Sequence, residues 1–372
     1  MREWTAIWVG VMIAAAAALP APASVAEQRS PRQQEPATRR AEQARPGEAA
    51  PPVEPVPPAE PGQPLEPAQP PEARPPVEPS QPGPIELFIA FRRAQLAAAG
   101  FTRHEAEIAG HRAVWWEKGE GPALVLVHGV NDQAGTWFQV APALAESHRV
   151  LLIDLPGHGE SEPADGPLPM TTVIEGFEAW LAAHAVVEGA STGPTLIGNS
   201  MGAWVALLAA ARHPERVGRV VAVNGGGLRA DTGGLDLLPD DREEARRLMA
   251  ALRDSASPPI PDPVLDDLVR RVETGEARRM FQANDDLESY LLEGRLGEIA
   301  TPVDLLWGES DRYLGRDYPQ RLLAGLPNAR LTWIERCGHL PQAECPQAFL
   351  ERLRELLALA PPAPPAEPGD AG

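Results

Sequence analysis

Cysteine is scarce in this chain of 372 residues, which contains two, Cys337 and Cys345. No cysteine lies near the N-terminus, and this absence excludes a lipoprotein anchor there. Both cysteines lie close to His339, and in an oxidising compartment such a pair favours a disulfide that ties down the loop around the histidine. Two buried thiols are the alternative, because the sequence does not show how far apart the two Cα atoms lie.

Basic residues are outnumbered, with 33 Lys and Arg against 52 Asp and Glu, which gives a formal net charge of -19. Such an acidic surface repels the phosphates of nucleic acids and the headgroups of anionic membranes. We therefore expect no nucleic-acid partner. The simplest role of the excess negative charge is to keep the protein soluble.

Large apolar residues are few between residues 31 and 84, where 18 of 54 positions are proline. Proline removes backbone donors, and so little apolar surface cannot offset the entropy of ordering the chain. The sequence therefore predicts a Pro/Glu-rich disordered linker over residues 27–84 and a second Pro-rich tail from about residue 360. The region able to fold begins at residue 85.

The N-terminal apolar run, Trp4–Leu19, is too short for a typical membrane span and suits the core of a signal peptide. Small residues at Ala21 and Ala23, or at Ser24 and Ala26, provide a cleavage site. We therefore expect residues 1–26 to direct export to the periplasm or the medium. An uncleaved N-terminal membrane anchor is the alternative.

Strand-like and helix-like segments alternate through the rest of the chain, which indicates an α/β fold with a mostly parallel sheet and helices on both faces. A helix is expected over residues 85–100, followed by a hairpin at Thr102–Ile108 and His111–Trp116. Strands are expected at Ala123–Val127, Arg149–Ile153, Thr195–Ile197, Arg219–Val223, Val303–Trp307 and Arg330–Ile334, and the continuous apolar run of the first suits burial on both faces. The intervening helices are expected at Thr136–Ser147, Thr171–Ala185, Met201–Arg212, Tyr318–Gly325 and Gln347–Leu359.

The alternation stops at about residues 227–299, which contain no strand-like run. Helices are expected there at Asp240–Arg253, Pro263–Glu273 and Asp285–Gly294. The sequence therefore predicts a helical cap inserted between two strands, over the carboxyl edge of the sheet.

Gly198–Gly202 reads G-x-S-x-G, follows a predicted strand and opens a predicted helix. This context is the one required for a nucleophile elbow, in which a tight turn projects a serine above the sheet. Ser200 is therefore the candidate nucleophile.

A serine hydroxyl needs a base, and His339 lies just after the last predicted strand. A carboxylate must hold the tautomer of the histidine, and Asp311 follows the preceding strand. Glu309 and Asp317 are the alternatives for the acid. For the oxyanion we expect the backbone N–H groups of Met201 and Val130.

The order of these motifs resembles that of the α/β-hydrolase superfamily, in its single-domain lipase and esterase branch. The resemblance covers residues 86–358 and implies an α/β-hydrolase fold with an inserted cap. The motifs that carry it are His128-Gly129, Asp154–Ser161, Gly198–Gly202, Gly308–Asp311 and Gly338-His339. His128 and His158 are structural in this resemblance. The segments Pro239–Leu252 and Pro258–Leu268 are similar to the caps of cold-active lipase-like esterases.

The chemistry that follows is hydrolysis of a small-molecule or lipid carboxylic ester through an acyl-enzyme on Ser200, with no metal or cofactor. Candidate residues for the substrate pocket are Trp137, Trp204, Met280 and Phe281, with ordinary core packing as the alternative for each. Three other functions stay open: an acyltransferase with the same triad, a carbon–carbon bond hydrolase and a non-catalytic binding module. The loop at 130–137 lacks the pattern associated with the carbon–carbon bond hydrolases. The oligomeric state is not indicated.

Overall fold

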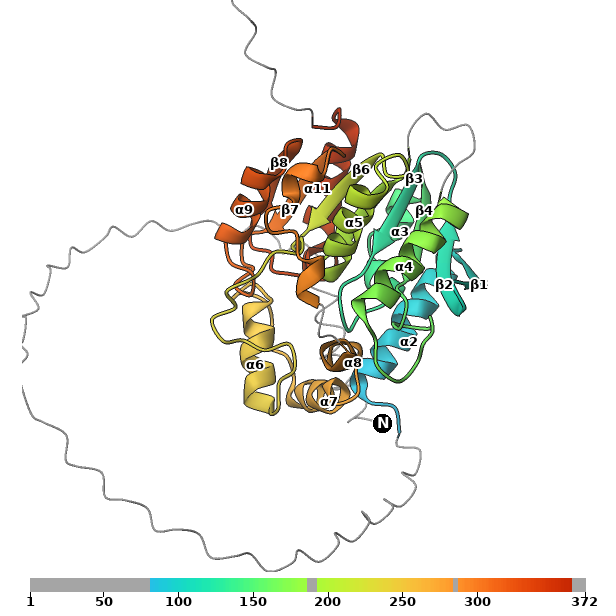
Figure 1. Ribbon diagram of the computed structural model, residues 1–372. Helices are drawn as coiled ribbons and strands as arrows, with labels where there is room; N and C mark the ends of the chain where they lie inside the picture. The colour runs from blue at the N-terminus through green and yellow to red at the C-terminus, as the bar shows by residue number, and fades with distance from the viewer. Residues whose placement is uncertain (1–80, 186–192, 284–286, 363–372) are drawn as a thin grey trace, which may run out of the picture. The chain divides into compact units, whose positions relative to one another are not determined.

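A computed structural model describes residues 81–185, 193–283 and 287–362 (Figure 1). The predicted signal peptide at 1–26, nearly all of the linker at 27–84 and most of the C-terminal tail lie outside the described residues. Within the described part of the chain, no helix is both long and apolar enough to cross a membrane.

The described residues form an eight-stranded sheet in the order β1-β2-β4-β3-β5-β6-β7-β8. Strands β1 and β2 pair antiparallel, as do β2 and β4, and every later pair is parallel. The strands are β1 (Thr102–Ile108), β2 (His111–Lys118), β3 (Ala123–Val127), β4 (Arg149–Asp154), β5 (Thr195–Asn199), β6 (Arg219–Val223), β7 (Val303–Gly308) and β8 (Ala329–Ile334). The predicted α/β class and the mostly parallel sheet are confirmed.

Two hydrophobic cores lie on opposite faces of the sheet because successive side chains of a strand point to opposite sides. In β3, Val125 and Val127 pack with one core, while Leu124 and Leu126 pack with the other. The first core is covered by α4 (Met170–Trp180), the π-helical turn η2 (Leu181–Ala185), α5 (Met201–Arg212) and α9 (Asp317–Gly325). The second is covered by α2 (Pro84–Ala98), η1 (Ala134–Trp137), α3 (Ala141–Leu144) and α11 (Pro346–Ala358).

Helices of the inserted segment lie together beyond one end of the sheet (Figure 1). They are α6 (Arg242–Ala251), α7 (Asp262–Val272), α8 (Glu276–Ala283), η3 (Leu287–Tyr290) and η4 (Leu296–Glu298). All of them fall between β6 and β7, so the described part of the segment is helical. We refer to residues 227–299 as the cap.

Two predicted helices differ from the structure, and one helix of the structure was not predicted. The helix expected at Thr136–Ser147 is two short pieces, η1 and α3, because Pro142 can start a helix and cannot continue one. The helix expected at Asp285–Gly294 is only the short η3 within the described residues. The sequence analysis missed α8, whose first turn is held by Asn131 from a distant loop.

Candidate active site

Ser200 occupies the tight turn between β5 and α5, with φ 54° and ψ -118°. This conformation is unfavourable for a residue with a Cβ, and the Ser200 N–H holds it through a hydrogen bond to Val223 O at 2.9 Å. The flanking glycines are needed for space: a Cβ on Gly202 would collide with the backbone oxygens of Val127 and His128. The turn therefore depends on backbone packing from the two neighbouring strands, β3 and β6.

His339 and Asp311 lie in contact, with 2.8 Å between His339 Nδ1 and Asp311 Oδ2. Asp311 is nearly fully buried, and its carboxylate is saturated with donors. Asn224 Nδ2 donates to Oδ2 at 2.8 Å, and the N–H groups of Tyr313 and Leu314 donate to Oδ1 at 3.1 Å. A carboxylate held in this way can accept only Nδ1–H from His339, which leaves Nε2 free to act as a base.

The pKa of Asp311 is lowered although burial by itself raises it. Desolvation is the largest single effect, but the charge and hydrogen bond of His339 outweigh it together with the hydrogen bonds from Asn224 and Leu314. Asp311 therefore stays ionised at neutral pH and holds the orientation of the imidazole ring.

The loop that carries His339 is fixed on three sides. The backbone N–H of His339 donates to Leu252 O at 2.8 Å, and the backbone carbonyl of His339 accepts a hydrogen bond from Asn199 Nδ2 at 2.9 Å. A disulfide joins Cys337 to Cys345, with 6.1 Å between their Cα atoms, which settles the question that the sequence left open. Sequence reasoning missed Asn199, whose place immediately before Ser200 was the available signal.

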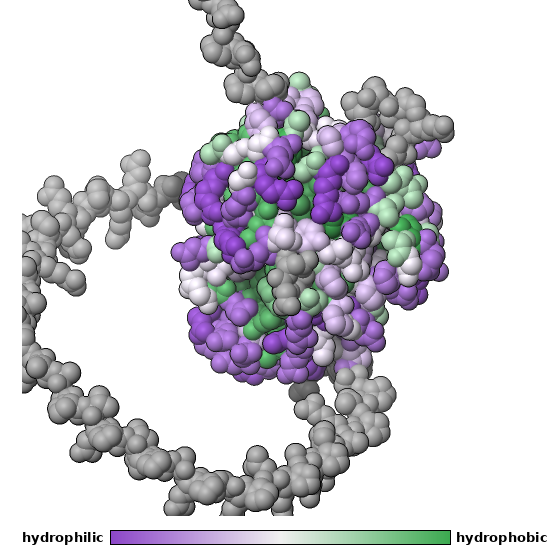
Figure 2. All heavy atoms as spheres, in the orientation of Figure 1, coloured by the Kyte–Doolittle hydropathy of each residue, from purple (hydrophilic) through white to green (hydrophobic). Residues whose placement is uncertain are grey.

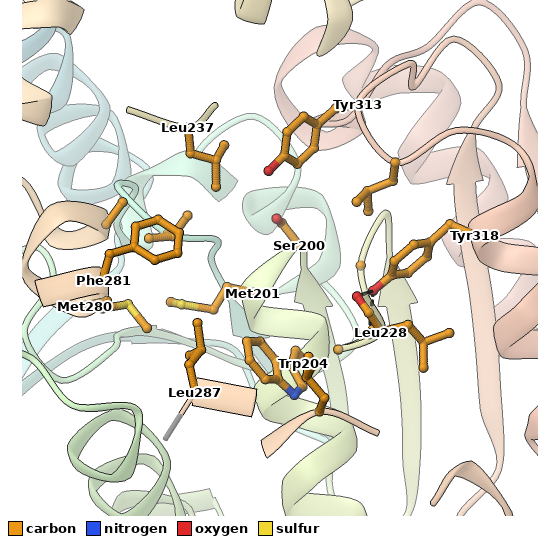
Figure 3. Close-up of a pocket in the computed structure, with 17 residues that line it drawn as sticks. Ser200, Met201, Trp204, Leu228, Leu237, Met280, Phe281, Leu287, Tyr313 and Tyr318 are labelled. Carbon is orange, nitrogen blue, oxygen red and sulfur yellow. Dashed lines mark hydrogen bonds between the residues drawn. The ribbon is translucent and has the colours of Figure 1, made fainter. Parts of the chain in front are cut away.

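A cavity of about 170 Å³ opens beside Ser200 between the sheet and the cap. Figure 3 shows Met201, Met280, Phe281 and Leu237 on one side of Ser200. The described residues that line the cavity are Val130, Ser200, Met201, Trp204, Gly225, Gly226, Gly227, Leu228, Leu237, Ala277, Met280, Phe281, Leu287, Leu291, Tyr313, Leu314 and Tyr318. None of these side chains carries a charge.

Three of the four predicted pocket residues, Trp204, Met280 and Phe281, line this cavity. The prediction for Trp137 is wrong. Its side chain is fully buried on the other face of the sheet, where its ring packs 6.1 Å from that of Phe349. The η1 turn that follows the β3 loop directs this tryptophan into the core.

Val130 and Met201, expected to supply the oxyanion donors, both line the cavity. Within the described residues, neither backbone N–H donates a hydrogen bond to another group. Two unused N–H groups beside a serine hydroxyl are what an oxyanion hole requires.

His128 braces the loop that carries Val130. Its Nδ1 lies 2.7 Å from Gly129 O, and its Nε2 accepts the N–H of Leu155 at 2.9 Å. Burial lowers the pKa of His128, so the ring is neutral and both nitrogens are occupied. Among the described residues, no three His, Cys, Asp or Glu side chains gather in a way that could hold a metal ion.

The chain belongs to the α/β hydrolase family, whose model matches residues 124–352. One curated relative is a 2-hydroxy-6-oxononadienedioate/2-hydroxy-6-oxononatrienedioate hydrolase of Cupriavidus pinatubonensis, 32% identical over 61% of this chain and 83% of the relative. Another is a 2-hydroxy-6-oxo-6-phenylhexa-2,4-dienoate hydrolase of Burkholderia cepacia, 28% identical over 69% of this chain and 95% of the relative.

Among solved structures, the chain is similar to a membrane phospholipase A described as a bacterial virulence factor, with 27% identity and a TM-score of 0.62. The match covers 73% of this chain and 90% of that structure. Membership of the family establishes a hydrolase fold. The names of the curated relatives imply cleavage of a carbon–carbon bond, whereas a phospholipase cleaves an ester bond. The residues that line the cavity therefore have to distinguish between these two reactions.

Proposed function

We propose that this protein hydrolyses carboxylic esters with an uncharged, apolar acyl group, through an acyl-enzyme on Ser200. The observation that carries the proposal is the cavity: its described walls are mostly apolar and offer no charged side chain. A carboxylate placed there would lose hydration without gaining a cationic partner, which costs several kcal/mol. An alkyl or aryl acyl group would instead gain from burial.

The proposed mechanism uses the groups described above. His339 Nε2 takes the proton of the Ser200 hydroxyl as its oxygen attacks the carbonyl, and Asp311 stabilises the imidazolium that forms. The N–H groups of Val130 and Met201 bind the oxyanion. The imidazolium then protonates the leaving alcohol, and a water activated by the same histidine releases the acid.

A second candidate is hydrolysis of a carbon–carbon bond, and the names of the curated relatives favour it over ester hydrolysis. Their 6-oxo acid substrates contain no ester, so hydrolysis must break a bond from the ketone carbon to a neighbouring carbon. The loop at 130–137 therefore does not by itself exclude this chemistry. The uncharged cavity speaks against the dienedioates, which carry two carboxylates.

The two candidates separate in one experiment with the full-length protein. Turnover of p-nitrophenyl butyrate and octanoate is compared with turnover of 2-hydroxy-6-oxo-6-phenylhexa-2,4-dienoate, each beside Ser200→Ala. We expect ester turnover that falls about 10⁴-fold or more in the variant, because the nucleophile is lost. Cleavage of the dienoate alone would establish the second candidate. Ester consumption that yields a new ester with added alcohol, in place of the acid, would identify an acyltransferase.

We also propose that the protein is exported, on the basis of the N-terminal apolar run and the small residues that follow it. Fractionation of the native host tests this: we expect the protein in the periplasm or medium without its first 26 residues, or in the membrane at full length. Full-length protein in the cytosol would contradict the proposal.

A further inference from the structure

Tyr313 lies two residues after Asp311 and forms part of the wall of the cavity. Its N–H donates to Asp311 Oδ1 at 3.1 Å, and its ring meets that of His339 edge to face, with 5.6 Å between centroids. Backbone and ring are therefore both held by groups of the candidate triad. Figure 3 shows that the hydroxyl at the end of this ring points toward Ser200.

The other polar side chains of the wall are already occupied. Trp204 Nε1–H donates to Tyr290 O at 2.9 Å. The Tyr318 hydroxyl accepts the N–H of Leu228 at 2.7 Å and donates to its carbonyl at 3.0 Å. The Tyr313 hydroxyl, by contrast, makes no hydrogen bond to another described residue. Apart from Ser200, it is the uncommitted polar side-chain group of the described cavity wall.

Burial, with the negative charges of Asp236 and Asp311, raises the pKa of Tyr313 to about 12. The group therefore stays protonated and can donate a hydrogen bond throughout the range in which an ester hydrolase works. Tyr313 is half-buried, so a substrate that fills the cavity displaces solvent from the hydroxyl, and the displacement is unfavourable unless a substrate oxygen accepts its hydrogen bond. Sites of this kind discriminate strongly against analogues that lack the polar group.

The position of the ring indicates which part of the substrate it meets. Tyr313 stands on the side of His339, and this histidine delivers its proton to the leaving alcohol. The oxyanion donors belong to other segments, Val130 to the loop after β3 and Met201 to the start of α5. The Tyr313 hydroxyl therefore lies beside the alcohol part of a bound ester.

We propose that Tyr313 determines specificity for the alcohol part of the ester, by donating a hydrogen bond to an oxygen that this alcohol carries beyond the scissile bond. The substrate class is then an ester of a glycol, glycerol or another polyol, in contrast to an ester of a plain alkyl alcohol. The inference rests on the proposed ester hydrolysis and adds the alcohol side of the substrate.

The test uses two esters of equal size, 2-hydroxyethyl butyrate and propyl butyrate, which differ by a hydroxyl in place of a methyl group. The measured quantity is the ratio of their kcat/KM values. We expect this ratio to fall about five- to tenfold from the wild type to Tyr313→Phe, the size of one neutral hydrogen bond. An unchanged ratio, or an equal loss for both esters, would overturn the proposal.

Tyr318→Phe is the matched control, since it removes a hydroxyl from the same wall that already bonds to Leu228. We expect this variant to unfold at a lower temperature and to keep the wild-type ratio, and a fall equal to that of Tyr313→Phe would count against the assignment. The two hypotheses fail in different ways. If the wild type hydrolyses neither ester, the proposed function fails. If it hydrolyses both esters and Tyr313→Phe leaves the ratio of the kcat/KM values unchanged, only this inference fails.

Discussion

Asn131, on the loop after β3, accepts the backbone N–H of Ala277 in the first turn of α8, with 2.8 Å between Asn131 Oδ1 and the nitrogen. Val130 precedes this asparagine and lines the cavity from the sheet side, while Ala277 and Met280 line it from the cap. One side chain therefore ties the candidate oxyanion loop to the cap helix that closes the cavity.

Asn131→Gly should lower both stability and activity. Asn131 has φ 58°, which glycine adopts easily, so the variant loses the acceptor without backbone strain. We expect a loss of about 1 kcal/mol in the free energy of unfolding, together with a lower kcat/KM, because the N–H of Ala277 is left without its partner. Asn131→Asp keeps the acceptor oxygen and should stay near the wild type. Urea unfolding and ester kinetics on the two variants check this, and equal behaviour of both would contradict the link.

Ser200→Gly should make the protein more stable while abolishing turnover. The backbone of Ser200, at φ 54° and ψ -118°, is strained for serine and open to glycine. We expect a gain of about 1 kcal/mol or more in the free energy of unfolding. Thermal unfolding beside Ser200→Ala, which keeps the Cβ and the strain, isolates the backbone effect. A glycine variant less stable than the alanine variant would argue against strain at this turn.

Loss of the disulfide between Cys337 and Cys345 should weaken the loop that holds His339. The bridge closes a loop with a sequence separation of 8, and chain entropy alone predicts about 2–3 kcal/mol of stabilisation. We expect reductant to lower both the Tm and the activity of the wild type. The double variant Cys337→Ser/Cys345→Ser should have the lower Tm and activity already without reductant, and reductant should change neither. If reductant lowered both quantities equally in the two proteins, its effect would not come from this disulfide.

Acid should destabilise the protein partly through His158, which is fully buried after β4. Burial, and then the proximity of His128, lowers the pKa of His158 from 6.5 to about 4. As the pH falls, His158 becomes protonated in the unfolded chain at about pH 6.5 but in the folded protein only at about pH 4. The free energy of unfolding therefore decreases between these two pH values, by about 3 kcal/mol. Asp154 opposes this trend, because burial raises its pKa to about 6 and folding then favours the protonated acid at low pH.

His158→Asn isolates the histidine contribution. The asparagine can keep a donor near Pro156 O, which lies 3.1 Å from His158 Nδ1, and it does not titrate. We expect the free energy of unfolding, measured in urea at pH 7 and pH 4.5, to fall less in the variant than in the wild type. Equal falls in the two proteins would show that His158 takes no part in acid unfolding.

Local patterns were enough to predict the fold class, the strands of the sheet and the contact between Asp311 and His339. A short, continuous apolar run such as Ala123–Val127, bounded by glycines, suits a strand buried on both faces. The strand–turn–helix context of Ser200 and the carboxyl edge of a parallel sheet then define where Asp311 and His339 can meet. These predictions depend on a few neighbouring residues, so the chain sequence carries them directly.

Tertiary structure decided the features that depend on distant partners. At the start of helix α8, the N–H of Ala277 donates a hydrogen bond to Asn131 on the loop after β3. The sequence near α8 contains no pattern that predicts this contact. Trp137 lies in the core because of the path that its loop takes, although its position in the sequence suited the cavity equally well. The disulfide could be assigned only from the distance between the Cα atoms of Cys337 and Cys345. The uncommitted hydroxyl of Tyr313 could be recognised only once the hydrogen bonds of Trp204 and Tyr318 were known. Periodicity and motifs are properties of neighbours in the chain, whereas a cavity and its free donors are properties of segments that meet only after folding.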